Sequence, residues 1–169
     1  MAFAIGGFMA TGKTTIGRDL ADHLGWPFHD LDVVVNSLCM KELGFSISEL
    51  IEQGQEELFR KMEHLCVLDW MSTLPEASIV ALGGGTLHNK GLGRHIKEHH
   101  RLVVLHAKWD FIKERIVNSK RPLRHTAEHL FVEREEGYRC GVQFCVENKS
   151  VSVCVQELNQ LIQGNHDVK

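Results

Sequence analysis

Short apolar runs alternate along the chain with longer stretches in which apolar residues recur every three or four positions. The first run, residues 2–5, is apolar throughout and stops at Gly6 and Gly7, which predicts a buried strand. Residues 14–24 then carry apolar side chains at four-residue steps, which predicts a helix with one apolar face that ends at Gly25. Further strands are expected at residues 26–29, 78–82, 101–106 and 142–146.

Capping signals and helical spacing predict the remaining helices. The segment from Ser46 to Glu49 has the capping-box pattern, so a helix should begin near Ile47. A longer helix with one apolar side follows, and others are expected at residues 92–98, at 109–117, up to about Tyr138, and at 151–162. Strand and helix alternate, which predicts an α/β fold with a parallel sheet between two helical layers. Ligands of such sheets bind at the carboxyl ends of the strands.

The composition is that of an ordinary globular protein and disfavours several functional classes. The 169 residues suit a single domain spanning 1–169, with 43% hydrophobic and 24% charged residues. A net charge of −3 argues against a dedicated nucleic-acid-binding protein. We see neither a signal-peptide pattern nor an apolar run long enough for a membrane helix, so no membrane association is expected.

The five cysteines have no spacing typical of a metal site or a disulfide framework, which indicates reduced thiols in the cytoplasm. Cys140 and Cys145 are open to two interpretations, half of a metal site or core thiols, and we favour core thiols. The neighbours His99 and His100 point in different directions on a helix, which indicates a solvated face rather than a pair of ligands.

A glycine-rich segment between the first strand and the first helix predicts a phosphate-binding loop. Residues 7–14, GFMATGKT, match the pattern G-x-x-x-x-G-K-[ST] in full and in the required context. Backbone N–H groups of such a loop surround a β-phosphate, and the helix N-terminus adds a positive field. Gly12 permits close approach, Lys13 reaches the β- and γ-phosphates, and the Thr14 hydroxyl can bind Mg²⁺. The alternative is a glycine turn with a chance lysine.

Two carboxylates, Asp30 and Asp32, follow the second predicted strand. Alternate strand residues point the same way, so both carboxylates can face one site. One could hold Mg²⁺, directly or through water, and the other could accept a proton from an attacking hydroxyl or position it. The alternative for this pattern is a solvated turn.

Arg60 and Glu63 lie three residues apart on the predicted long helix and therefore share a face. They could form an ordinary surface ion pair. Alternatively, Glu63 could hold Arg60 so that its planar guanidinium binds a substrate carboxylate.

Three consecutive glycines, Gly83, Gly84 and Gly85, end the third predicted strand. Such a run is entropically costly and suits close approach of the backbone to a ligand. Arg121 opens a basic stretch and Arg134 follows in the next helix; either could bind a transferring phosphoryl group or an anionic acceptor, or be solvated charge.

Together these motifs resemble shikimate kinase. The segments GFMATGKTT, HDLD, LFRKME, LGGG, RPL and REEGY occur in the order typical of that family, and the resemblance covers about residues 2–161. It implies a three-layer α/β/α P-loop fold with a five-stranded parallel sheet and a lid at about 119–133. It also implies transfer of the γ-phosphoryl group of ATP to the 3-hydroxyl of shikimate, with Mg²⁺, in the chorismate pathway to aromatic amino acids.

The resemblance assigns a role to each matched residue. Asp32 looks like the group that holds the reacting hydroxyl, assisted catalytically by Lys13 and Arg121. The nucleotide-binding residues implied by the match are Ala10, Thr11, Gly12, Lys13, Thr14, Thr15, Arg115 and Arg121. The shikimate-binding residues implied are Asp32, Arg60, Gly83, Gly84, Gly85 and Arg134. Thr14 and Asp30 look like the magnesium side, and Lys149 is a further candidate near the adenine.

The sequence departs from the family pattern at three places. Ala10 stands where glycine is usual, and Gln55 with Glu56 replaces the usual Gly-Glu pair. The segment between Arg121 and Arg134 is several residues shorter than is typical. A short lid should exclude water less well, so we expect weaker nucleotide retention or more ATP hydrolysis without acceptor.

Two other functions are compatible with parts of the pattern. One is a different small-molecule kinase of the same fold, such as a gluconate-type kinase, and the other is a non-catalytic nucleotide-binding module. The acceptor-side residues suit a compact carboxylated polyol and disfavour the first. The intact phosphate-side residues disfavour the second. The partners expected are therefore ATP and shikimate, without nucleic acid or membrane, and the family analogy suggests a monomer.

Overall fold

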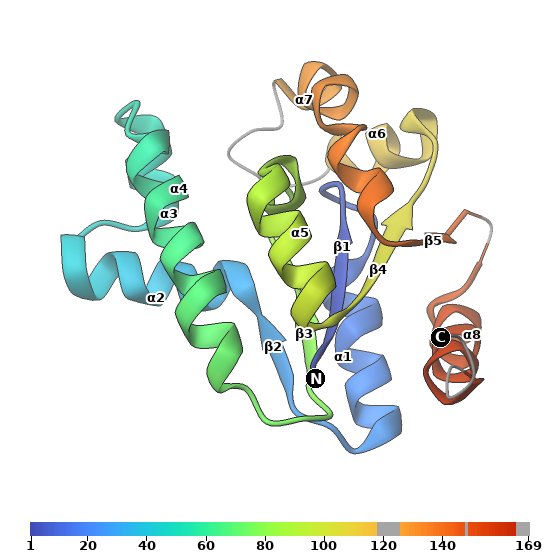
Figure 1. Ribbon diagram of the computed structural model, residues 1–169. Helices are drawn as coiled ribbons and strands as arrows, with labels where there is room; N and C mark the ends of the chain where they lie inside the picture. Colours follow the sequence, from blue (N-terminus) through green and yellow to red (C-terminus); the bar gives the residue numbers. More distant parts are fainter. Residues whose placement is uncertain (118–125, 148, 165–169) are drawn as a thin grey trace.

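The computed structural model describes residues 1–117, 126–147 and 149–164, and its centre is a parallel β-sheet (Figure 1). The sheet has five strands in the order β2-β3-β1-β4-β5, and every neighbouring pair is parallel. The strands are β1 (Phe3–Gly7), β2 (Phe28–Asp30), β3 (Ile79–Ala81), β4 (Arg101–His106) and β5 (Val142–Cys145). The α/β fold with a five-stranded parallel sheet is therefore confirmed.

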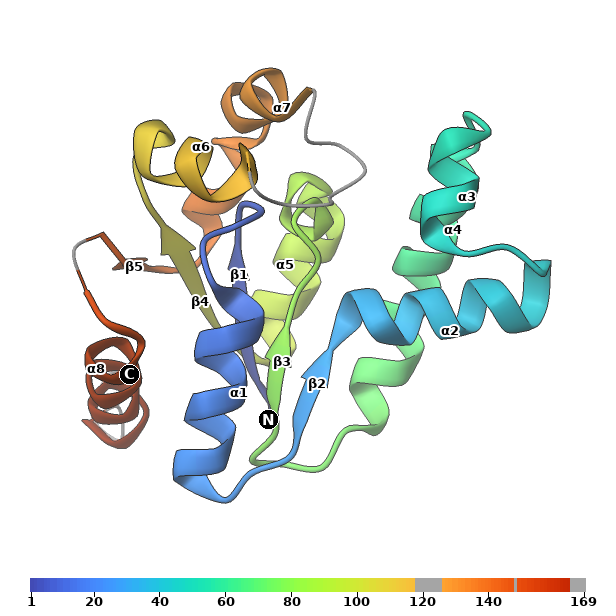
Figure 2. The ribbon, with the colours of Figure 1, turned by 180° about the vertical axis from the view of Figure 1, so that it is seen from behind.

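The helices cover both faces of this sheet. Helices α1 and α8 pack together on one face, α5 lies on the other, and α2 to α4 stand beside the β2 edge (Figures 1 and 2). The α-helices are α1 (Lys13–Leu24), α2 (Leu31–Leu43), α3 (Ile47–Glu52), α4 (Glu56–Leu65), α5 (Lys90–His99), α6 (Trp109–Val117), α7 (Ala127–Arg134) and α8 (Val151–Gly164). Shorter turns are a π-helical turn η1 (Cys66–Trp70) and the 3₁₀ turns η2 (Met71–Thr73), η3 (Thr86–His88) and η5 (Gly137–Cys140).

The buried strands explain why the sheet lies in the core. All five residues of β1 are buried, as are the three of β3 and the central four of β4. Strands covered on both faces should be apolar throughout, and this is the pattern that made them recognisable in the sequence. The capping box at Ser46 and the left-handed C-cap at Gly25 are also confirmed.

Helix α2 is the element that the hydrophobic pattern did not predict. Its buried face consists of Leu31, Val35 and Cys39 at four-residue steps. The pattern was hidden because exposed positions of the helix are apolar as well, with Val33 62% and Met40 49% exposed. Asp30 caps this helix, since its side chain accepts a hydrogen bond from the backbone N–H of Asp32.

The described part of the chain holds no helix with both the length and the apolarity that crossing a bilayer requires. All five cysteines are free: three are buried, Cys140 is half-buried and Cys145 is exposed.

Candidate active site

The glycine-rich segment forms a compact loop between β1 and α1. Gly12, the residue before the helix, has φ 98°, a left-handed conformation that favours glycine. The Lys13 side chain is buried and its Nζ donates to the carbonyl oxygens of Gly7 and Phe8, each at 2.9 Å. Thr11 also turns inward, donating from Oγ1 to the Phe8 carbonyl at 2.8 Å. The loop therefore presents backbone N–H groups at the start of α1, as an anion site requires.

Ala10 is the unusual residue of this loop. It has φ 64°, one of two left-handed non-glycine residues in the described chain. L-residues with a Cβ are disfavoured in this region, so the substitution of the usual glycine leaves local backbone strain. The Ala10 carbonyl oxygen accepts a hydrogen bond from Arg115 Nη1 at 3.1 Å, and this guanidinium also stacks 4.9 Å from the Phe111 ring. Arg115 thus lies against the loop, as its candidate role near the nucleotide requires.

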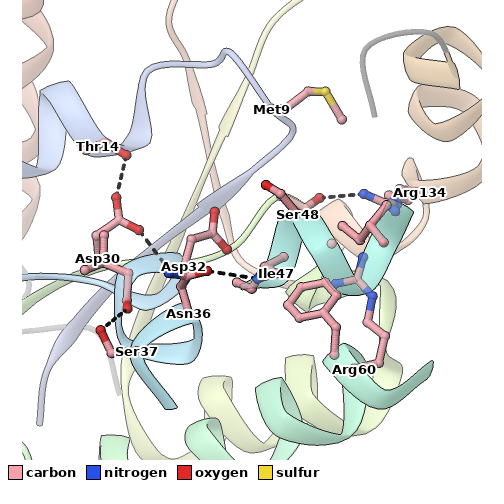
Figure 3. A pocket seen from close by; sticks show the side chains of 15 residues that line it. Met9, Thr14, Asp30, Asp32, Asn36, Ser37, Ile47, Ser48, Arg60 and Arg134 are labelled. Atoms are coloured by element: carbon pink, nitrogen blue, oxygen red, sulfur yellow. Dashed lines mark hydrogen bonds between the residues drawn. The ribbon is translucent and has the colours of Figure 1, made fainter. Parts of the chain in front are cut away.

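Thr14 and the two aspartates meet beside the loop (Figure 3). Thr14 Oγ1 donates to Asp30 Oδ2 at 2.8 Å, and Asp30 Oδ1 accepts the Asp32 backbone N–H at 3.1 Å. The expected arrangement on one strand is wrong, because β2 ends at Asp30 and Asp32 belongs to the first turn of α2. The helix turn, rather than strand alternation, brings both carboxylates to one site.

The pair Thr14 and Asp30 fits a magnesium ion. Its hydroxyl and carboxylate oxygens are the hard ligands that Mg²⁺ prefers, and Mg²⁺ typically takes one or two carboxylates beside phosphates and water. Among the described residues no group of three or more His, Cys, Asp or Glu is placed to hold a metal alone.

Arg60 is held by two carboxylates of its own helix. Its Nη1 donates to Glu63 Oε2 at 2.8 Å and its Nη2 to Glu56 Oε1 at 2.9 Å. The guanidinium also stacks on the Phe59 ring at 4.4 Å. Glu63 is 2% exposed, so this is not the ordinary surface pair that the sequence left open. Thr86 Oγ1 donates to the other Glu63 oxygen, Oε1, at 2.5 Å.

The glycine triplet passes close to these charged groups. A Cβ on Gly83 would lie 2.6 Å from Asp32 Oδ1, and one on Gly85 would lie 2.8 Å from both terminal nitrogens of Arg60. Larger residues therefore cannot occupy either position without displacing a charged side chain. The Gly84 carbonyl oxygen accepts from Tyr138 at 2.5 Å and from Arg134 Nη1 at 3.4 Å.

Arg134 and Tyr138 are both buried beside the glycine triplet. Arg134 is 5% exposed, and its Nε has no hydrogen-bond partner among the described residues. Burial raises the pKa of the Tyr138 hydroxyl above its usual value, partly offset by the nearby Arg134 charge. An arginine buried with an unused donor beside a pocket is suited to binding an anion.

These groups line two hollows, which we call the large pocket and the loop hollow. The large pocket has a volume of about 520 Å³ (Figure 3). Its lining is Met9, Thr14, Asp30, Asp32, Val33, Asn36, Ser37, Ile47, Ser48, Ile51, Phe59, Arg60, Gly84, Gly85 and Arg134. The loop hollow, about 230 Å³, is lined by Ala10, Gly12, Lys13, Thr14, Thr15, Asp32, Leu82 and Arg115.

Thr14 and Asp32 line both hollows. A group bound in the loop hollow and a molecule bound in the large pocket would therefore meet at these two side chains. This geometry suits transfer of a group from one site to the other.

Some candidates lie elsewhere. Lys149 pairs with Glu157 at 2.5 Å, stacks on the Phe144 ring at 4.6 Å, and lines neither hollow. Gly83 and Thr11 do not line them either, although Gly83 lies against Asp32. Arg121 and residues 119–125 of the expected lid lie outside the described residues.

Sequence reasoning missed the part of the large pocket that comes from α2 and α3. Asn36 of α2 accepts the backbone N–H of Ile47 at 2.9 Å and so joins these two helices. No motif marks these residues, because they lie on two helices whose relative position depends on tertiary packing. Two further residues were missed for the same reason. Thr86 directly follows the glycine triplet, and Tyr138 lies inside the recognised REEGY segment.

Comparison with known proteins identifies the family of the chain. The family model described as Shikimate kinase matches residues 9–162. Shikimate kinase from Geobacillus thermodenitrificans is 34% identical over 140 residues, covering 78% of this chain and 72% of the relative. The enzyme from Caldanaerobacter subterraneus is 30% identical over 160 residues and 90% of each chain. The crystal structure of shikimate kinase from Aquifex aeolicus superimposes with a TM-score of 0.80, at 30% identity and 98% coverage of both chains. The chain therefore belongs to the shikimate kinase family.

Proposed function

We propose that this chain transfers the γ-phosphoryl group of ATP to the 3-hydroxyl of shikimate, giving shikimate 3-phosphate and ADP. The observation that carries the proposal is the meeting of the two hollows at Thr14 and Asp32. The loop hollow has the chemistry of a phosphate site, and the large pocket combines two carboxylates, Asp30 and Asp32, with two arginines. Shikimate, which has a carboxylate and ring hydroxyls, has complementary groups.

In this proposal the large pocket binds the acceptor. Arg60 and Arg134 bind its carboxylate, since a planar guanidinium can form two parallel hydrogen bonds with it. Asp32 accepts a hydrogen bond from the reacting hydroxyl and orients it toward the loop hollow. The backbone of Gly84 and Gly85 lies against the ring, and a Cβ on Gly85 would lie only 2.8 Å from the Arg60 guanidinium.

The loop hollow binds the nucleotide. Backbone N–H groups of residues 10–15 surround the phosphates, and the Lys13 ammonium moves from its loop carbonyls to the β- and γ-phosphates. Thr14 and Asp30 hold Mg²⁺, which when bound neutralises phosphate charge and orients the γ-phosphoryl group. Arg115 flanks the nucleotide, and Arg121 is proposed to contact the phosphates.

The test is ADP release by the purified protein with ATP and Mg²⁺, with and without shikimate. Asp32→Asn should lower kcat about 100-fold or more, because it removes the group that orients and deprotonates the hydroxyl. Arg60→Ala should raise KM for shikimate about 10- to 100-fold, the effect expected for losing a charge-assisted hydrogen bond. Arg94→Ala, which changes an exposed arginine on α5, is the matched control and should leave both parameters unaltered.

ADP release that is independent of shikimate, from a protein that still binds ATP, would overturn the proposed acceptor.

We also propose that residues 1–169 form a single domain that acts as a cytoplasmic monomer. The five free thiols support the reducing compartment. Sedimentation equilibrium should give a mass near 19.2 kDa.

A further inference from the structure

We propose that Thr86 is a positioning residue for the acceptor, acting through Glu63 on Arg60. This inference rests on the proposed function, in which Arg60 binds the acceptor carboxylate. Thr86 does not line the large pocket, and its side chain is fully buried in the turn that directly follows the glycine triplet.

Each oxygen of the Glu63 carboxylate accepts a hydrogen bond from a different side chain. Its Oε1 accepts from Thr86 Oγ1 at 2.5 Å, and its Oε2 accepts from Arg60 Nη1 at 2.8 Å. A carboxylate held at only one oxygen can rotate about its terminal torsion, which is broad in energy. With both oxygens engaged, the rotation is blocked and the Arg60 nitrogen has a fixed partner.

The arginine is correspondingly fixed on its other sides. Its Nη2 donates to Glu56, whose side chain is 45% exposed and competes with water for this bond. A Cβ added to Gly85 would lie 2.8 Å from each terminal nitrogen, so the guanidinium plane rests against the glycine triplet. The buried bond to Glu63 is the less water-exposed of the two ion pairs, and Thr86 is the residue that orients it.

The same hydroxyl lies next to the second carboxylate of the site. Around the position of a Cβ on Gly83, Asp32 Oδ1 lies at 2.6 Å, Thr86 Oγ1 at 2.9 Å and Glu63 Oε1 at 3.0 Å. Two carboxylates this near to each other repel. The Thr86 hydroxyl donates its one hydrogen to Glu63 Oε1. This oxygen therefore keeps a hydrogen-bond donor beside Asp32, while the other oxygen, Oε2, remains paired with Arg60.

The test compares Thr86→Val, which has the same shape without the hydroxyl, with Thr86→Ser, which retains the hydroxyl. In steady-state ADP-release assays, Thr86→Val should raise KM for shikimate about tenfold, the size expected for losing a hydrogen bond to a charged group. KM for ATP and kcat should each stay within roughly twofold, because the lost interaction affects binding of the acceptor alone. Thr86→Ser should restore KM for shikimate to within about threefold of the wild-type value.

If Thr86 had only a structural role, Thr86→Val would lower the stability of the protein without raising KM for shikimate selectively over KM for ATP. Thr73→Val is the matched control, since Thr73 is exposed, its hydroxyl donates to the Trp70 carbonyl, and it lines neither hollow. If the valine variant does not fold, Thr86→Ala removes the same hydroxyl with less crowding and is measured instead.

A double-mutant cycle tests the route through Glu63. In a Glu63→Gln background, Thr86→Val should no longer raise KM for shikimate, because its effect requires the carboxylate. An unaltered KM in the single valine variant, or the same tenfold rise in both backgrounds, would overturn the inference. If the inference about Thr86 fails but Arg60→Ala still raises KM for shikimate, the proposed function stands. If ADP release by the wild-type protein does not depend on shikimate, the proposed function itself fails.

Discussion

Replacing Ala10 by glycine should stabilise the protein. Ala10 has φ 64°, and a residue with a Cβ in the left-handed region carries a cost of about 1–2 kcal/mol. Glycine removes this cost but adds about 0.4–1 kcal/mol of conformational entropy to the unfolded chain. At the midpoints of these two ranges, the net gain in the free energy of unfolding is about 0.8 kcal/mol. For a chain of this length, a gain of that size raises Tm by about 1–4 °C.

Differential scanning calorimetry of the nucleotide-free protein measures this shift. Ala77→Gly is the matched control outside the loop, because Ala77 also has a left-handed backbone, with φ 60°, and should show a similar gain. Ala21→Gly is the opposite control, since Ala21 lies inside helix α1 and the change should cost about 1 kcal/mol.

The reasoning is refuted if Ala10→Gly leaves Tm unaltered or lowers it while Ala77→Gly raises it. That result would mean that the left-handed conformation at Ala10 carries no strain, or that its hydrogen bond to Arg115 compensates for it. Repeating the scan with Arg115→Ala in both backgrounds separates these two explanations.

Three further outcomes are expected. Gly83→Ala places a Cβ 2.6 Å from Asp32 Oδ1, so kcat/KM for shikimate should fall about tenfold or more while ATP affinity measured by calorimetry is retained; equal losses for both ligands would contradict this. Asp30→Asn keeps a capping acceptor but removes the charge beside Thr14, so the Mg²⁺ concentration that half-saturates ADP release should rise about tenfold at unaltered Tm, and an unaltered Mg²⁺ requirement would argue against the proposed site. Burial raises the pKa of Tyr138, the only tyrosine, above its usual value of about 10. Its contribution to stability is thus complete below about pH 10 and is lost as the pH rises through the raised pKa, so ultraviolet difference absorbance should show no phenolate in the folded protein near pH 10.

Some residues of the large pocket could be predicted from the sequence, and others became apparent only from the packing of the helices. Its residues Thr14, Asp30 and Arg60 were recognised because each belongs to a short motif whose residues are neighbours along the chain. The facing wall was not, since Asn36 and its neighbours on α2 and α3 meet the motifs only through tertiary contacts. An exposed apolar residue such as Val33 was misleading in the sequence because it lines the pocket rather than the core.

The sequence by itself determined the alternation of strands and helices, the phosphate loop and the chemical identity of the charged groups. These properties are local: they follow from side-chain periodicity, capping residues and backbone freedom within a few positions. Only the tertiary structure decided that Asp32 lies in the first turn of a helix, that Thr86 binds the buried Glu63, and that two hollows meet at Thr14 and Asp32. The contact of Thr86 with Glu63 and the meeting of the two hollows join segments far apart in the chain, and their distances are set by how the helices pack on the sheet.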